Sequence, residues 1–333
     1  MTEPRFLVVR LGSLGDIVHT FPAVAALRAT FPKAEIAWLT HPRWKLLVGT
    51  SGLASQIWTV ETRSFASVRE TISKTRKANF SAAIDYQGLW KSASLPFLSR
   101  VPRRIGFSSE TIREFGVPLL YTDRVRASAT HIAEQNGELS LRAGACDPVT
   151  KFSLRVPEQG ECAIRDFLRP NSLDRYIVLS PGGGWRSKCW PAQRFGALCH
   201  RIHSSLGLRC VINYGPGEEQ LASTVQSASG DTAPLLYNGD LSSLMALLRN
   251  AVCIVGGDTG PLHLAVALGT PAVAIFGPTN PARNGPYPPG DIVLRASNVA
   301  TTHAREEETH PSLLSIEVDA VFDAVCRRIG VAA

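Results

Sequence analysis

The sequence lacks the features of a membrane-spanning, secreted or disulfide-bonded protein. No run approaches about 18 uninterrupted apolar residues, and the start MTEPRFLVVRLGSLGD lacks the order of basic, apolar and small residues in a secretory signal. The seven cysteines form an odd set without a C-x-x-C pair, so neither a disulfide framework nor a zinc ribbon is predicted. We therefore expect a cytoplasmic chain with reduced thiols.

Several catalytic signatures are also absent. The chain has no Asp-x-Asp to hold a divalent metal, no G-x-x-x-x-G-K-[ST] phosphate loop, and neither G-x-S-x-G nor H-E-x-x-H. It also has no RNA-binding aromatic motif. These absences argue against P-loop enzymes, hydrolases with a nucleophile elbow and zinc proteases, and they predict no metal site.

What is present is an α/β pattern that occurs twice. The 333 residues suffice for two domains of about 150 residues each. Apolar strand-like runs, separated by segments long enough for crossover helices, occupy 6–10, 36–40, 56–60, 82–86, 176–180, 208–214, 252–256 and 271–276. This spacing predicts two doubly wound parallel sheets.

A polar stretch broken by proline and glycine, residues 147–174, separates the two patterns. We expect an N-terminal domain over 1–165 and a C-terminal domain over 171–314. A last helix within 315–333 has no strand after it and could pack back on the N-terminal domain.

The positive charge is confined to the first half of the chain. Residues 1–170 hold 23 Lys and Arg against 15 Asp and Glu, whereas residues 171–333 hold 12 against 13. Within 43–104 there are 11 basic and three acidic side chains. This bias indicates a partner with several negative charges, such as nucleic acid, anionic lipid or a phosphorylated small acceptor, or else a solvated surface with a chance excess.

The first candidate site is the loop Leu11-Gly-Ser-Leu-Gly-Asp16, which follows the first strand. Open α/β sheets bind ligands at this edge. Gly12 and Gly15 allow close approach of a ligand to the backbone, and Asp16 lies at or just inside a helix start. The carboxylate could cap that helix or act as a general base.

The second candidate site is the loop Ser180-Pro-Gly-Gly-Gly-Trp-Arg-Ser-Lys-Cys-Trp-Pro191. Its glycines, Gly183 and Gly184 among them, leave amides unobstructed, while Arg186 and Lys188 supply positive charge before a helix. Amides, cations and a helix N-terminus together favour a diphosphate. A plain connecting loop is the alternative.

Two further segments follow strands of the second half. Gly256-Gly-Asp-Thr-Gly-Pro-Leu-His263 leads into a helix, so the amides of Thr259 and Gly260 and the side chain of His263 suit an anion. Asp258 could hold this loop or bind a sugar hydroxyl, and an N-cap beside a packed histidine is the alternative. Glu218 and Glu219 follow another strand, where carboxylates accept ribose hydroxyls, although helix-starting acids are often only solvated.

Five collinear segments carry a resemblance to a known family. They are Val9-Arg-Leu-Gly-Ser-Leu-Gly-Asp-Ile-Val-His-Thr-Phe-Pro22, Asp85-Tyr-Gln-Gly-Leu-Trp-Lys-Ser92, Lys188-Cys-Trp-Pro191, Gly257-Asp-Thr-Gly-Pro-Leu-His263 and Phe276-Gly-Pro-Thr279. Together they resemble the ADP-heptose:lipopolysaccharide heptosyltransferases (glycosyltransferase family 9), most nearly those of the heptosyltransferase I type. The resemblance implies a GT-B fold, with two Rossmann-like domains facing across a cleft, and inverting, metal-independent heptose transfer from ADP-heptose.

The resemblance also implies roles for individual residues. Asp16 matches the family's proposed catalytic base, and Lys188 matches the lysine that contacts the donor phosphates. The implied donor-binding residues are Gly183, Gly184, Glu218 or Glu219, Gly239, Leu241, Asp258, Thr259, Gly260 and His263. Gly183 and Gly184 stand where heptosyltransferase I commonly has threonines.

For the acceptor, the resemblance implies an anionic Kdo-lipid A molecule and contact with the cytoplasmic face of the inner membrane. The candidate acceptor-binding residues are Gly12, Ser13, Lys91, Arg103, Arg104 and Arg113. No cofactor beyond the ADP-sugar co-substrate, no metal and no nucleic acid is expected. The alternatives are a transferase for another nucleotide sugar and a non-catalytic nucleotide-sugar-binding protein.

Overall fold

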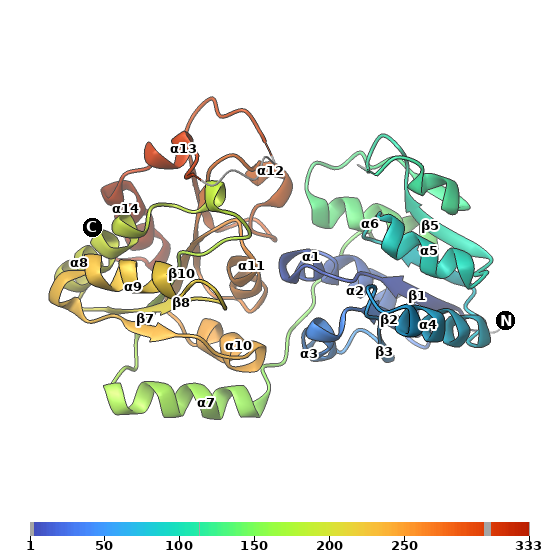
Figure 1. Cartoon of the computed structure of the whole chain (residues 1–333), viewed down its shortest axis with the longest axis horizontal. Coiled ribbons are helices and arrows are strands. Elements are labelled where there is room, and N and C mark those ends of the chain that lie inside the picture. Colours follow the sequence, from blue (N-terminus) through green and yellow to red (C-terminus); the bar gives the residue numbers. More distant parts are fainter. Residues whose placement is uncertain (1–2, 113, 303–307, 333) are drawn as a thin grey trace. The chain divides into compact units, whose positions relative to one another are not determined.

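The chain forms two compact units, Met1–Arg155 and Val156–Ala333 (Figure 1). This computed structural model describes residues 3–112, 114–302 and 308–332. The division falls ten residues before the expected domain end at 165. The reason is helix α7 (Glu158–Leu168), which packs against α10 (Leu241–Arg249) of the second unit.

The first unit is built on a six-stranded parallel sheet with the order β3-β2-β1-β4-β5-β6. Its strands are β1 (Arg5–Val9), β2 (Glu35–Thr40), β3 (Gln56–Thr59), β4 (Ala82–Asp85), β5 (Arg103–Phe107) and β6 (Asp123–Val125). The apolar runs at 6–10, 36–40, 56–60 and 82–86 predict the first four of these strands. β5 and β6 were not predicted, because β5 begins with two arginines and β6 is only three residues long.

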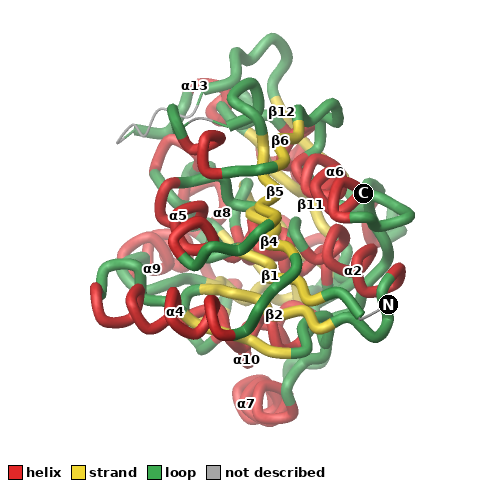
Figure 2. The backbone as a smooth tube through the Cα atoms, turned by 90° about the vertical axis from the view of Figure 1, so that its right-hand side faces the viewer, coloured by secondary structure: helices red, strands yellow, loops and turns green. Residues whose placement is uncertain are grey.

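Helices cover both faces of this sheet, with α4 and α5 on one side and α2 and α6 on the other (Figure 2). The helices are α1 (Leu14–Val18), α2 (Phe21–Thr30), α3 (Lys45–Thr50), α4 (Phe65–Lys77), α5 (Trp90–Leu98) and α6 (Ile132–Ala143). The Ser64 hydroxyl caps α4 by accepting from the backbone N–H of Ser67. The first turn of α1 carries Asp16.

The second unit repeats this architecture with a six-stranded parallel sheet in the order β12-β11-β10-β7-β8-β9. Its strands are β7 (Tyr176–Ser180), β8 (Arg209–Asn213), β9 (Leu235–Tyr237), β10 (Cys253–Gly257), β11 (Ala272–Phe276) and β12 (Ile292–Arg295). Counted from the first strand of each unit, both sheets have the same order. The strand order therefore reverses between β1 and β4 in one unit and between β7 and β10 in the other, where ligands bind in such sheets.

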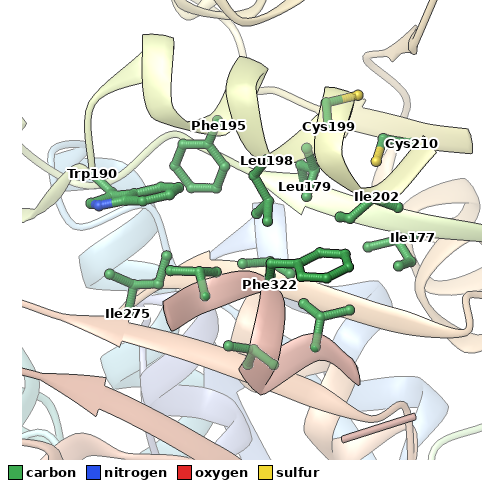
Figure 3. Packing of buried hydrophobic residues seen from close by; sticks show 14 of the residues in the cluster. Ile177, Leu179, Trp190, Phe195, Leu198, Cys199, Ile202, Cys210, Ile275 and Phe322 are labelled. Carbon is green, nitrogen blue, oxygen red and sulfur yellow. The ribbon is translucent and has the colours of Figure 1, made fainter. Parts of the chain in front are cut away.

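The helices of the second unit enclose a core that includes the last helix. Besides α7 and α10 they are α8 (Ala192–Leu206), α9 (Glu219–Ala228), α11 (Gly260–Ala267), α12 (Pro281–Asn284), α13 (Pro311–Leu314) and α14 (Val318–Ile329). Figure 3 shows Phe322 of α14 in one buried cluster with Trp190 and Phe195. α14 packs against α8, β10 and β11, so its apolar face is buried within the second unit, where the sequence analysis had considered a return to the N-terminal domain.

None of the helices in the described ranges combines the length and apolar character needed to cross a bilayer.

Candidate functional site

In the first unit, a buried arginine holds an exposed aspartate at the end of β1. The Arg10 guanidinium pairs with the Asp16 carboxylate at 2.7 Å and also donates to the carbonyl of Tyr86. The Arg10 side chain is 7% exposed and that of Asp16 is 44% exposed. The pair therefore presents a carboxylate to the ligand-binding edge while its counter-charge stays inside.

The loop before α1 fixes the same carboxylate from a second side. Ser13 is the N-cap of α1, and Asp16 Oδ2 accepts the backbone N–H of Ser13 at 2.9 Å and lies 3.1 Å from its hydroxyl. This is the returning half of a capping box, so Asp16 is the third residue of the helix rather than its cap. A side chain at Gly12 would meet the indole of Trp44 at 2.8 Å, which is why glycine stands there.

A buried aspartate that the sequence analysis did not single out supports this loop. Asp85, at the end of β4, accepts from the hydroxyls of Tyr121 at 2.7 Å and Ser92 at 2.9 Å and from the backbone N–H of Gln87. The Gln87 side chain in turn accepts the backbone N–H of Leu11 at 2.7 Å. Burial raises the pKa of Asp85, although these hydrogen bonds oppose the shift.

In the second unit, Lys188, Asp258 and His263 form one buried cluster between the ends of β7 and β10. Lys188 Nζ lies 2.8 Å from Asp258 Oδ2, and His263 Nε2 lies 3.1 Å from Oδ1. Their side chains are 10%, 8% and 5% exposed. Burial alone would raise the pKa of Asp258, but the His263 hydrogen bond and the Lys188 charge outweigh burial and lower it. Asp258 is therefore ionised at neutral pH and holds both partners.

The helix start beside this cluster has the features of an anion site. Thr259 is the N-cap of α11, makes no side-chain capping bond, and has a buried hydroxyl without a hydrogen-bond partner among the described residues. The first backbone N–H groups of a helix have no partner within it. Gly183 adjoins this start, because a side chain added there would contact Thr259 at 3.8 Å, and Gly184 faces open space.

The structure separates the two glutamates. A side chain at Gly182 would meet the Glu218 carboxylate at 2.1 Å, so Glu218 lies against the glycine-rich loop, where it also accepts the backbone N–H of Gly215 at 2.7 Å. Glu219 is exposed and accepts only from Gly217 among the hydrogen bonds recorded for the described residues. Glu218 is thus the glutamate beside the second candidate site.

Two other donor candidates lie at the same edge of the second sheet. Gly239 follows β9 and has no room for a side chain, because Tyr237 Oη would lie 2.3 Å away. Leu241 begins α10 after its N-cap Asp240, whose carboxylate accepts the backbone N–H of Ser243.

The basic acceptor candidates do not lie together. Lys91 is exposed on the first turn of α5, after β4. Arg103 and Arg104 begin β5 and so lie at the opposite end of the strands from Asp16. Arg103 pairs with Asp123 at 3.2 Å, and Arg104 donates to the carbonyls of Leu120 and Val101. Arg113 lies outside the described residues.

No group of three or more His, Cys, Asp and Glu side chains in the described part of the chain has an arrangement that could hold a metal ion.

Comparison with known proteins gives one consistent result. The model of glycosyltransferase family 9 (heptosyltransferase) matches residues 68–313. Lipopolysaccharide heptosyltransferase 1 of Escherichia coli K12 is 28% identical over 310 residues, covering 88% of this chain and 93% of that protein. The namesake from Pseudomonas aeruginosa is 26% identical, covering 85% and 81%.

Solved structures of the family share the fold. A glycosyl transferase family 9 protein from Veillonella parvula superimposes with a TM-score of 0.84 at 21% identity, covering 99% of this chain and 98% of its own. The E. coli heptosyltransferase WaaC with ADP gives a TM-score of 0.75 at 24% identity, covering 97% and 99%.

Proposed function

Because the chain belongs to glycosyltransferase family 9 and is therefore a glycosyltransferase of the GT-B fold, we propose that it transfers heptose from ADP-heptose to the Kdo region of lipopolysaccharide. The names of its relatives support this substrate class. The observation that carries the proposal is the buried Lys188, Asp258 and His263 cluster beside the open start of α11. Together with the exposed Asp16 carboxylate, these residues provide the two kinds of group that glycosyl transfer requires, namely a base for the acceptor hydroxyl and positive charge for the leaving diphosphate.

The donor is proposed to bind to the second unit. Lys188, His263 and the amides of Thr259 and Gly260 bind the diphosphate, because the lysine cation and the helix-start amides both stabilise phosphate charge. Asp258 orients Lys188 and His263 and accepts a hydrogen bond from a sugar hydroxyl. Glu218 accepts the ribose hydroxyls, and the backbone of Gly239 and Leu241 contacts adenine.

The acceptor is proposed to react at the first unit. Asp16 takes the proton from an acceptor hydroxyl, whose oxygen attacks the anomeric carbon on the face opposite ADP. The new glycosidic bond forms as the bond to the ADP phosphate breaks, so the anomeric configuration inverts. ADP leaves with the electron pair of the broken bond, and its charge is stabilised by Lys188 and the α11 amides.

We propose that these fixed charges take the place of a divalent metal. The support is the 2.8 Å pair between Lys188 and Asp258, which keeps a cation at the site before the donor binds. Preorganised positive charge of this kind needs no reorganisation during reaction. Transfer is then expected to proceed in EDTA, and a loss of activity that Mg²⁺ restores would contradict this part of the proposal.

The acceptor is proposed to be anionic Kdo-lipid A, which would place the enzyme at the cytoplasmic face of the inner membrane. The support is the excess of basic residues in the first unit and the exposed Lys91 beside the Asp85 loop. Gly12 and Ser13 would contact the acceptor next to Asp16. No nucleic acid is required by this proposal.

One observation favours a second candidate, a related transferase for another nucleotide sugar. Gly183 and Gly184 offer no hydroxyl to the donor, and Gly184 faces open space. A donor with a bulkier or differently oriented group could occupy that space.

Turnover with ADP-heptose, ADP-glucose and GDP-mannose on Kdo-lipid A separates these functions, with the mass of the product as the readout. We expect ADP release and a heptose mass increment with ADP-heptose only. Faster transfer from another nucleotide sugar would establish the second candidate. Binding of ADP-heptose without ADP release in the presence of acceptor would establish a non-catalytic binding protein.

A further inference from the structure

The large apolar side chains exposed to solvent are unevenly distributed between the two units. Among the described residues, the exposed aromatic side chains Phe65, Trp90, Phe97 and Phe115 all belong to the first unit. That unit also holds the net positive charge, since residues 1–155 contain 21 Lys and Arg against 12 Asp and Glu. Exposed aromatic groups and positive charge therefore occur on the same unit.

Most of these side chains come from two adjacent elements. Trp90, Phe97 and Leu98 lie on α5, while Phe115 and Leu119 lie in and just before the short helix η2 (Val117–Leu120), which packs against α5. Phe115 is 98% exposed and Leu119 is 70% exposed. We call these five side chains the α5 surface.

Contacts at both ends of α5 hold these side chains on one surface. At one end, the indole N–H of Trp90 donates to the carbonyl of Phe115 at 3.2 Å. At the other end, the Arg104 guanidinium lies over the Phe97 ring at 5.4 Å and donates to the carbonyl of Leu120 at 2.8 Å. Hydrogen bonds from side chains to backbone carbonyls thus hold α5 and Arg104 against the segment that carries Phe115 and Leu119.

Positive charge surrounds the α5 surface. Neither α5 nor η2 contains an acidic residue. Arg76 donates to the carbonyl of Leu98 at 2.8 Å, and Arg124 donates to that of Pro118 at 2.9 Å. The cations on these elements and beside them are Arg76, Lys91, Arg100, Arg104 and Arg124. The carboxylate of Glu114 also lies here and accepts the backbone N–H of Trp90.

We propose that the α5 surface binds the surface of an anionic phospholipid bilayer. Contiguous exposed apolar groups mark an interaction site, and aromatic rings with long basic side chains suit the boundary between headgroups and acyl chains. The charge argues against a second copy of this chain, because two such surfaces would bring like charges together. Negatively charged lipid complements both the rings and the cations.

This inference rests on the proposed function in one respect, namely that the acceptor is anchored in lipid. Trp90 begins α5 directly after the loop in which Gln87 binds the Leu11 backbone and Asp85 binds Gln87. The bilayer would therefore be bound next to the loop that carries Asp16. A membrane-anchored acceptor would meet the base without leaving its bilayer.

The experiment measures sedimentation of the full chain with vesicles in the absence of both substrates. The vesicles contain either phosphatidylcholine alone or phosphatidylcholine mixed with phosphatidylglycerol. Two variants remove apolar groups from the α5 surface. One is a double variant that carries both Phe115→Ser and Leu119→Ser, and the other is the single variant Leu98→Ser. Leu314→Ser in the second unit is the matched control, because Leu98 is 48% exposed and Leu314 is 47% exposed. Arg100→Gln is compared with Arg327→Gln, an exposed arginine of α14.

We expect the wild type to bind the phosphatidylglycerol vesicles, more weakly as salt rises. The double variant should lower the partition coefficient at least about tenfold, and Arg100→Gln should lower it about fivefold, while both controls should bind like the wild type. Equal binding by the double variant and the wild type, or equal wild-type binding to both vesicles, would overturn the proposal. A solution molar mass that is lower for the double variant than for the wild type would also overturn the proposal, because it would show that the wild type self-associates through the α5 surface.

Activity on a delipidated, water-soluble acceptor keeps the two proposals apart. The α5-surface variants should retain wild-type turnover there and lose it only when the acceptor is embedded in vesicles. If neither the wild type nor any variant transfers sugar but all of them bind vesicles as expected, the proposed function is wrong. The proposal that the α5 surface binds a bilayer is then still supported.

Discussion

The two units use the same strand order to hold charges in opposite ways. In the first unit the internal charge is the Arg10 cation and the presented charge is the Asp16 anion, which is 44% exposed. In the second unit both charges of the pair are buried, since Lys188 is 10% exposed and Asp258 is 8% exposed. Under the proposed function Asp258 is the internal charge and Lys188 is the charge presented to the donor. A shared fold therefore sets where a site lies, while the residues placed there set the sign of the charge offered to the ligand.

The loops that carry these charges also differ. Residues 10–13 alone connect β1 to α1, and hydrogen bonds from Ser13 and Leu11 fasten this connection. Residues 181–191 connect β7 to α8 and include three adjacent glycines. A short, fastened loop suits the proposed base, which must meet one hydroxyl, whereas a longer loop with three glycines and two cations suits the proposed extended diphosphate.

The largest expected effect is on the first unit's carboxylate. Asp16→Asn should lower kcat by about 10² to 10⁴, the range for a positioned acid or base, with little change in donor binding. Ser13→Ala is the comparison, because it removes the hydroxyl contact at 3.1 Å and leaves the backbone N–H bond to Asp16. Any loss of its proposed acceptor contact should raise the acceptor KM and leave kcat near the wild-type value. Steady-state kinetics with both substrates check this, and near-full activity of Asp16→Asn would reduce the residue to a helix-stabilising role.

Removing the internal charge of the second unit should affect stability. Asp258→Asn leaves Lys188 buried without its counter-charge, which should lower the free energy of unfolding by about 3 kcal/mol at neutral pH. The folded-state pKa of Asp258 is lowered, so its stabilisation is present above the unfolded pKa of about 4 and is lost as pH falls through the folded pKa. The difference between wild type and variant in urea unfolding should therefore narrow below about pH 4. A difference that widens in acid would contradict this assignment.

Removing the presented charge of the second unit should affect donor binding. Lys188→Ala should weaken ADP-heptose binding by about 1.5 to 3 kcal/mol, the contribution of a charge-assisted hydrogen bond. Arg186→Ala, which removes an exposed cation of the same loop, should change it far less. Calorimetric titration with ADP-heptose in the absence of acceptor measures both changes in binding. Equal losses in the two variants would mean that net charge of the loop, rather than the buried pair, binds phosphate.

A smaller effect separates the adjacent glutamates. Glu218→Gln should raise the KM for the donor about tenfold, because a charged acceptor of ribose hydroxyls is lost, whereas Glu219→Gln should leave it near the wild-type value. Donor KM values at saturating acceptor provide the test. A larger effect of Glu219→Gln would place the ribose elsewhere.

The smallest effect concerns the two ends of the first sheet. Arg103→Gln breaks a partly exposed pair with Asp123 and should lower the free energy of unfolding by less than about 1 kcal/mol. Its acceptor KM should stay unchanged, while Lys91→Gln, at the Asp16 end of the strands, should raise the acceptor KM. An acceptor KM that responds to Arg103 and not to Lys91 would place the acceptor at the Arg103 end of the strands.

Most of the strands that the sequence predicted have buried, continuous apolar runs. β7 is one example, with all five residues buried. The edge strand β3, in which only Trp58 is buried, is the exception. The strands that were missed, β5, β6, β9 and β12, lie at or next to sheet edges. β5 and β6 begin with charged residues, whereas β9 and β12 begin with apolar residues but are only three and four residues long, so the periodicity of all four strands is weak. α7 was missed because Pro157 was interpreted as an interruption, although it precedes the first turn of this helix.

The site was predicted at the level of segments but not of contacts. The order of strand, loop and helix placed Asp16, Lys188 and Asp258 at ligand-binding edges. It gave no sign that Asp85 would meet Tyr121, because that contact joins residues 36 positions apart. Nor could it separate Glu218 from Glu219, since only the approach of Glu218 to Gly182 in space distinguishes them.

The approach of Glu218 to Gly182 makes the effect of a substitution at position 182 hard to detect from protein stability. A methyl group at Gly182 would push against the far end of a flexible side chain, which can move aside at little cost to folding. Gly182→Ala should therefore yield a protein that expresses and melts like the wild type, while its Glu218 carboxylate points away from the donor. Surveys that rank substitutions by lost stability would pass over this position, and only an assay of donor affinity would reveal it.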